Sequence, residues 1–113
     1  MSKVFKMSVE SVYQHYVVKV ERKGRTVAEL NKVICWLTGL TPSELKKHLK
    51  AKTTFEDFFK TVKLNKNAKK ITGTICGVRI EELEDPLMKK IRYMDKLVDE
   101  LAKGRPMEKI LRD

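Results

Sequence analysis

The chain has 113 residues, of which 42% are hydrophobic and 35% are charged. This length is typical of one globular domain, and the apolar fraction is too high for a disordered chain, so we expect a single domain over residues 1–113. Lysine and arginine number 25 against 15 aspartate and glutamate residues, which gives a formal net charge of +10. Such a charge attracts polyanions at long range but identifies neither a reaction nor a ligand.

The cysteines and the apolar runs indicate the cellular compartment of the protein. Cys35 and Cys76 lie 41 positions apart, without the dense spacing of a secreted disulfide scaffold, so we expect reduced thiols in a cytoplasm. The first residues lack the apolar core of a signal peptide, and the longest apolar run, Val33 to Leu37, is far too short to cross a membrane. We therefore expect a cytoplasmic protein with no membrane partner.

The first helix is expected over residues 9–23. Apolar residues recur every three or four positions from Val9 to Val20, which is the spacing of one face of a helix. Ser8 stands where an N-cap is needed, and Gly24 stands where a helix commonly ends.

Three Thr-x-x-Glu pairs predict the starts of three further short helices. The pairs are Thr26 with Glu29, Thr41 with Glu44 and Thr53 with Glu56. In such a capping box the threonine accepts a hydrogen bond from the backbone three residues on, and the glutamate returns one. Gly39 ends the first of these helices, Pro42 opens the second, and three phenylalanines make the third a core element.

The segment from residue 65 to residue 80 fits two structures. Asn65 can cap a short helix that carries Ile71 and Ile75 and ends at Gly77, which is the interpretation we prefer. The β-branched residues over 71–80 also suit a strand, although no typical hairpin turn is present.

A long helix is expected to begin with Asp85 and Pro86 and to end at Lys103 and Gly104, followed by a short turn over residues 106–111. The whole pattern predicts an all-α, single-domain orthogonal bundle of six to seven mostly short helices around this long C-terminal helix.

Four stretches of the chain resemble a known family. They are "ERKGRT", "ICWLTG", "ITGTICGVRIEELEDPLMKKIRYMDKLVDELAKG" and "MEKIL". Together they resemble the small bacterial family named domain of unknown function 2200, over nearly the whole chain. The resemblance implies a bacterial, all-helical, single-domain protein. It brings no known activity, cofactor or functional residue to any position here.

The two expected helices around Gly39 fit the outline of a helix-turn-helix. Such a unit needs a glycine turn, a buried apolar residue such as Leu45, and a second helix that presents polar side chains. Thr38 and His48 depart from the pattern, because both stand where a buried apolar residue is usual. We favour the alternative interpretation of two core helices joined by a capped turn.

Nine lysines between residues 46 and 70 form the candidate nucleic-acid site. They are Lys46, Lys47, Lys50, Lys52, Lys60, Lys63, Lys66, Lys69 and Lys70. The first three lie on the side of their helix opposite Leu45 and Leu49, so helical geometry points them to solvent. No side chain on that face is suited to reading bases, so we expect sequence-independent phosphate contact by lysines gathered into one patch. With four to six such contacts, the logarithm of affinity should fall with the logarithm of salt at a slope of about −4 to −5 on duplex DNA. A merely solvated surface is the alternative.

The remaining chemistry-bearing residues favour structural roles. Tyr13, Tyr16 and Trp36 lie on or beside apolar stripes, so we expect core packing rather than base stacking. The histidines and cysteines lack the close spacing of a zinc site, so no metal or cofactor is expected. The acidic cluster Glu81, Glu82, Glu84 and Asp85 precedes a helix, where the helix dipole favours acids.

These observations lead to one functional interpretation and two alternatives. We expect a non-enzymatic binding module that makes weak, sequence-independent contact with nucleic acid through the lysine-rich region. A protein-interaction or adaptor role, through an exposed helix face or the acidic segment, is the second reading. The third is a small-molecule enzyme whose site forms only in three dimensions.

Overall fold

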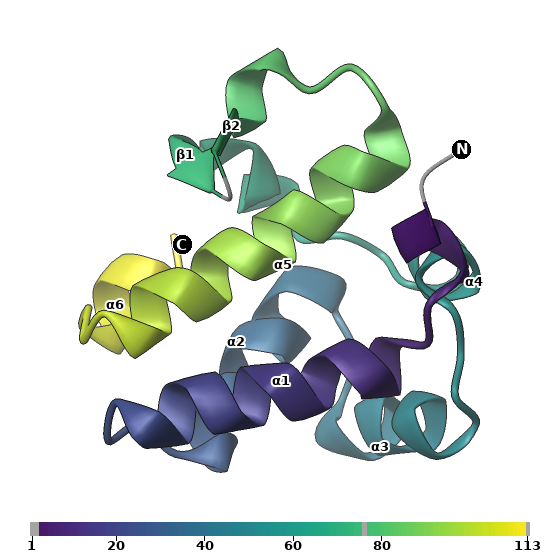
Figure 1. Cartoon of the computed structure of the whole chain (residues 1–113), viewed down its shortest axis with the longest axis horizontal. Coiled ribbons are helices and arrows are strands. Elements are labelled where there is room, and N and C mark those ends of the chain that lie inside the picture. The colour runs from purple at the N-terminus through teal and green to yellow at the C-terminus, as the bar shows by residue number, and fades with distance from the viewer. Residues whose placement is uncertain (1–2, 76, 113) are drawn as a thin grey trace.

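The computed structural model describes residues 3–75 and 77–112, and Figure 1 shows its arrangement. Within these residues the chain is almost wholly helical, with three 3₁₀ turns and one antiparallel hairpin. The elements are η1 (Lys3–Lys6), α1 (Val9–Arg22), α2 (Val27–Thr38), α3 (Pro42–Lys50), α4 (Phe55–Thr61), η2 (Lys66–Lys70), β1 (Thr74–Ile75), β2 (Val78–Arg79), η3 (Ile80–Glu82), α5 (Pro86–Ala102) and α6 (Met107–Ile110). The all-α prediction, with short helices around a long C-terminal one, is confirmed.

Capping explains where the first three helices begin. The Ser8 hydroxyl accepts a hydrogen bond from the backbone N–H of Ser11 at 3.2 Å. The predicted boxes at Thr26 and Thr41 are both present, with each glutamate accepting from the backbone N–H of its threonine at 3.0 and 2.9 Å. These caps satisfy backbone donors that the first helical turn leaves unpaired.

The prediction for the start of α4 is wrong by one residue. Thr54, not Thr53, is the N-cap, and its hydroxyl accepts from the backbone N–H of Asp57 at 3.2 Å. The carbonyl of Thr53 instead accepts from the backbone N–H of Val9 at 2.8 Å. Thr53 is therefore held in a bridge to the start of α1, and the helix begins one position later.

The preferred helix that Asn65 caps and that ends at Gly77 is wrong beyond Lys70. Asn65 does cap a short turn, η2, but the chain then extends and forms the hairpin, with Thr74 paired to Arg79 and Ile75 to Val78. Gly77 has a φ of 76°, a conformation that glycine adopts without strain. Ile71 and Ile75 still face the core, so their burial agrees with the sequence pattern although the secondary structure differs.

The described residues share one hydrophobic core, and α5 runs through the middle of the molecule. In Figure 1 this helix lies diagonally between the hairpin and the pair α1 and α2, and α6 folds back at its C-terminal end. Leu97, Val98 and Leu101 of α5 have no exposed surface. Burying apolar side chains on several sides of one helix is what allows short helices, each with little surface to bury, to share a core.

A tight turn at Gly39 sets the position of α3 against α2. Gly39 has a φ of 73°, and a Cβ atom at this residue would lie 2.8 Å from the carbonyl oxygen of Lys63. Asn65 fixes the same segment, because its backbone N–H donates to the carbonyl of Leu37 at 2.8 Å. The chain after α4 is thus packed directly on the α2–α3 turn.

Candidate nucleic-acid interface

Helix α3 carries the centre of the lysine-rich region. Leu45 is buried and Leu49 is half-buried, so this side of the helix faces the core. Lys46, Lys47 and Lys50 are exposed, as the helical spacing predicts. Lys52 follows the helix and is exposed as well. We call Lys46, Lys47, Lys50 and Lys52 the α3 lysines.

The other five lysines are exposed too, but they lie on different parts of the fold. Lys60 belongs to α4, and it lines a hollow together with Pro86 and Leu87 of α5. The segment η2, which carries Lys66, Lys69 and Lys70, comes just before the hairpin and lies with it in the upper half of Figure 1, whereas α3 lies at the bottom. The fold therefore brings the α3 lysines together and separates them from the η2 lysines.

None of the α3 lysines forms an ion pair with a residue that the structure describes, although the charge of Lys47 contributes to lowering the pKa of Glu44. Of the nine candidate lysines, Lys60 is the one with an ion pair there, to Glu56 at 3.9 Å. Glu44, the acid on α3 itself, is occupied by its capping box, and the hydrogen bonds from Thr41 hold the pKa of Glu44 below its ordinary value. The positive charge on α3 is thus left for solvent or a ligand.

The two positions that depart from a helix-turn-helix have structural partners. Thr38 is fully buried, and its hydroxyl donates to the carbonyl of Ile34 at 2.8 Å. The Nδ1 atom of His48 lies 3.1 Å from the hydroxyl of Thr53, and the imidazole packs edge to face with Phe58 at 5.2 Å between ring centroids. These contacts bind α2 and α3 into the core and leave the lysine face of α3 outside it.

Next to the α3 lysines lies a groove that the sequence did not reveal. One hollow of about 360 Å³ is lined by Tyr13, Asn31, Pro42, Leu45, Lys46 and Leu49. A second hollow of about 390 Å³ is lined by Ala28, Asn31, Lys32, Cys35 and Pro42. Because the two share Asn31 and Pro42, we treat them as one feature, the Asn31 groove. Its walls come from α1, α2 and α3. Because these helices meet only in the folded protein, the groove cannot be predicted from residue spacing along the chain.

The polar groups of the Asn31 groove are partly buried. The Tyr13 hydroxyl donates to Oδ1 of Asn31 at 2.5 Å. Burial raises the pKa of Tyr13, which keeps the phenol protonated at neutral pH. Burial, together with the nearby Glu44 carboxylate, also raises the pKa of the Cys35 thiol, so this cysteine is not an activated nucleophile.

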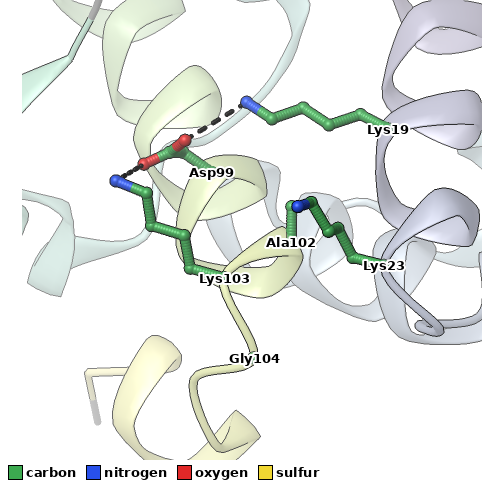
Figure 2. Close-up of a pocket in the computed structure, with 6 residues that line it drawn as sticks. All are labelled: Lys19, Lys23, Asp99, Ala102, Lys103 and Gly104. Atoms are coloured by element: carbon green, nitrogen blue, oxygen red, sulfur yellow. Dashed lines mark hydrogen bonds and ion pairs between the residues drawn. The ribbon is translucent and has the colours of Figure 1, made fainter.

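A larger hollow, of about 560 Å³, lies where α1 and α5 end (Figure 2). Lys19 and Lys103 both contact the Asp99 carboxylate, at 3.3 and 3.0 Å, while the Lys23 side chain extends toward Ala102 and has no marked contact with Asp99. Burial raises the pKa of Asp99, but the hydrogen bonds from Lys103 and Lys19 lower it by more. Two helix C-termini meet here, and their partial negative charge attracts lysines without any ligand. The arrangement is explained by the fold.

The acidic segment before α5 is also used within the protein. The Asp85 carboxylate caps α5 by accepting from the backbone N–H of Met88 at 3.0 Å. Glu81 accepts from the backbone N–H of Gly73 at 3.0 Å, and Arg79 lies 3.7 Å from both Glu81 and Glu82. Three of these four acids therefore have structural partners.

Residues 3–75 and 77–112 show neither a metal-binding cluster nor a membrane-spanning helix. No group of three or more histidine, cysteine, aspartate or glutamate side chains is placed there to hold a metal ion. In the same part of the chain, no helix has both the length and the apolar surface needed to cross a membrane.

Comparison with known proteins identifies the family. A solved structure titled "Crystal structure of uncharacterized protein SP1917" is 44% identical in sequence, with a TM-score of 0.91, and the match covers 98% of this chain and 93% of that one. No curated protein matches this chain. The model of the family described as "Uncharacterized protein conserved in bacteria (DUF2200)" matches residues 3–112. Because that match spans nearly the whole sequence, the chain belongs to the DUF2200 family of uncharacterized bacterial proteins.

Proposed function

We propose that this chain is a cytoplasmic, non-enzymatic binding module that contacts nucleic acid without sequence preference through lysines of the segment from Lys46 to Lys70. The α3 lysines make the main contact. The observation that carries the proposal is that these four exposed lysines lie on or next to one short helix and form no ion pair with the described residues.

The charge in this segment suits contact with phosphate groups. Residues 41–70 carry nine lysines and three acids. Lysine contacts a phosphate as a flexible point charge, and such contacts supply non-specific affinity rather than base reading. Among the three acids, Glu56 is paired with Lys6 and Lys60, whereas Glu44 and Asp57 form no ion pair with the described residues, so positive charge still exceeds negative charge in this segment.

The test is a titration of labelled duplex DNA with the full chain at several salt concentrations, followed by fluorescence anisotropy. Four phosphate contacts should give a slope of about −4 for the logarithm of affinity against the logarithm of salt. An affinity that does not change with salt, or no binding at micromolar protein, contradicts the proposal.

A charge-matched pair of variants separates local contact from overall charge. The triple variant Lys46→Gln, Lys47→Gln, Lys50→Gln should keep its fold, because all three side chains are exposed, while the slope falls to about −1. The control replaces three lysines on other elements, Lys23, Lys89 and Lys109, with glutamine. It loses the same charge but should retain a slope of about −4. Equal losses in both variants would show that only net charge matters.

A further inference from the structure

We propose that the Asn31 groove holds an unpaired base of a single-stranded nucleic acid while the α3 lysines contact the adjoining phosphates. This inference rests on the proposed function and adds the kind of nucleic acid that the surface takes. Its basis is the position of the groove, since Lys46 belongs both to the groove wall and to the α3 lysines.

The groove offers one hydrogen-bond donor for a base edge. Because Oδ1 of Asn31 accepts the Tyr13 hydroxyl, the side-chain amide is oriented with its Nδ2 group left over. None of the described residues accepts a hydrogen bond from Nδ2, and Asn31 is only half-exposed. The Nδ2 group of Asn31 can therefore donate a hydrogen bond to an acceptor atom of a ligand. Every nucleobase edge carries such acceptors.

The walls of the groove suit a flat ring. Leu45, which is 2% exposed, forms the base of the first hollow, with Leu49 and Pro42 beside it and the Tyr13 ring on α1. Apolar walls with a few placed polar groups are the usual composition of a ligand site, and a hollow of about 360 Å³ falls within the common range of such sites. A phosphate alone would gain nothing from these side chains.

The charges around the groove match a nucleotide. Lys46 lines the first hollow and Lys32 lines the second; Glu44 is near Cys35 at the second hollow but lines neither hollow. A base in the groove would place its own phosphates within reach of cations on both sides. This arrangement combines an apolar site with flanking positive charge, as single-strand binding proteins do.

Base pairing determines which nucleic acid fits. In a duplex the base faces are stacked and the pairing edges are occupied, so a duplex can offer phosphates to the α3 lysines but no base to the groove. A single strand can offer both.

The experiment compares two strands of equal charge. One is an oligothymidine of about ten nucleotides, and the other is a fully abasic strand with the same number of phosphates. Their affinities for the full chain are measured by competition against a labelled strand. The intact strand should bind roughly fivefold or more tightly, and this ratio should persist as salt is raised, because the base contact is not ionic.

A conservative variant locates the base. Asn31→Asp keeps an oxygen for the Tyr13 hydroxyl but removes the Nδ2 donor, so the ratio of intact to abasic affinity should fall toward one. Ser43→Asp adds the same charge to an exposed position at the start of α3 that lines neither hollow, and its ratio should equal that of the unmodified protein. Using a ratio cancels the general effect of added negative charge.

The outcomes distinguish this inference from the proposed function. Salt-dependent binding with equal affinity for the intact and abasic strands overturns the inference and leaves the proposed function standing. A ratio unchanged by Asn31→Asp also overturns the inference, because the base then lies elsewhere. Failure of both strands and of the duplex to bind overturns the proposed function itself.

Discussion

At the scale of single residues, Gly39 occupies a position that only glycine fits without strain. Its φ of 73° lies in the left-handed region, and a Cβ atom would meet the backbone oxygen of Lys63, which has no room to move because Asn65 is bonded to α2. Two separate penalties therefore apply to any other residue here, one from the backbone conformation and one from the clash.

Gly39→Ala should lower the free energy of unfolding by about 3 kcal/mol. The control is Gly104→Ala, since Gly104 has a φ of 87° but nothing lies within 4 Å of the added carbon. That variant should lose only the conformational part, about 1 kcal/mol. Urea denaturation of both variants measures the difference, and equal losses would mean that the approach to Lys63 carries no cost.

Among the secondary-structure elements, the capping boxes link stability to pH. The pKa of Glu44 is held below its ordinary value by the backbone hydrogen bond from Thr41 and then by the threonine side chain. A carboxyl whose pKa is lower in the folded state stabilises that state fully above its ordinary value of 4.5, and this contribution is lost as the pH falls through the lower folded value.

Glu44→Gln should remove that pH dependence, because an amide oxygen can accept the same bond but does not titrate. The stability of the unmodified protein relative to the variant should therefore decrease as the pH falls from about 6 to about 3. Urea titrations at several pH values provide the measurement. Glu29→Gln, at the other capping box, should show the same trend, and a difference that stays constant with pH would contradict the assignment.

The secondary-structure elements also show which features of the fold could be predicted from the sequence. Local signals such as Ser8, the Thr41 box and Asp85 predicted helix starts because each acts within one turn of chain. At α4, Thr53 and Thr54 each have an acidic residue three positions later, so the sequence allows either threonine as the N-cap. The hydrogen bond from the backbone N–H of Val9 to the Thr53 carbonyl holds Thr53 outside the helix, and Thr54 is the cap. The hairpin strands have two residues each, too few to show alternation. The exposure of the α3 lysines could be predicted from helical spacing. The Asn31 groove could not, because it forms only when α1, α2 and α3 pack together.

On the scale of the whole molecule, Glu100 ties the end of the chain to α5. Its Oε2 atom accepts from Arg105 at 3.1 Å and from Arg112 at 2.7 Å, and the residue is 5% exposed. Its Oε1 atom is buried without a hydrogen-bond partner among the described residues. A buried carboxylate depends strongly on its partners, because removing the more buried of two partners leaves its charge less well compensated in a region of low polarity.

Arg112→Gln should therefore destabilise the protein by about 3 kcal/mol, as measured by chemical denaturation at neutral pH. Arg105 has a side chain that is 44% exposed, so Arg105→Gln should lower stability by less than about 1 kcal/mol. If both variants lost the same free energy of unfolding, burial would not explain the strength of the ion pair between Arg112 and Glu100.

The central place of α5 also has a consequence for synthesis on the ribosome. This helix packs against α1, α2, α4 and α6, yet it comes after the first 85 residues of the chain. While those earlier residues emerge, α1, α2 and α3 can pack on one another, but the apolar side chains that α5 covers in the folded protein stay exposed. We expect the nascent chain to stay loosely collapsed and open to chaperones, and to reach its cooperative folded state in one late step once residues 86–102 have left the exit tunnel.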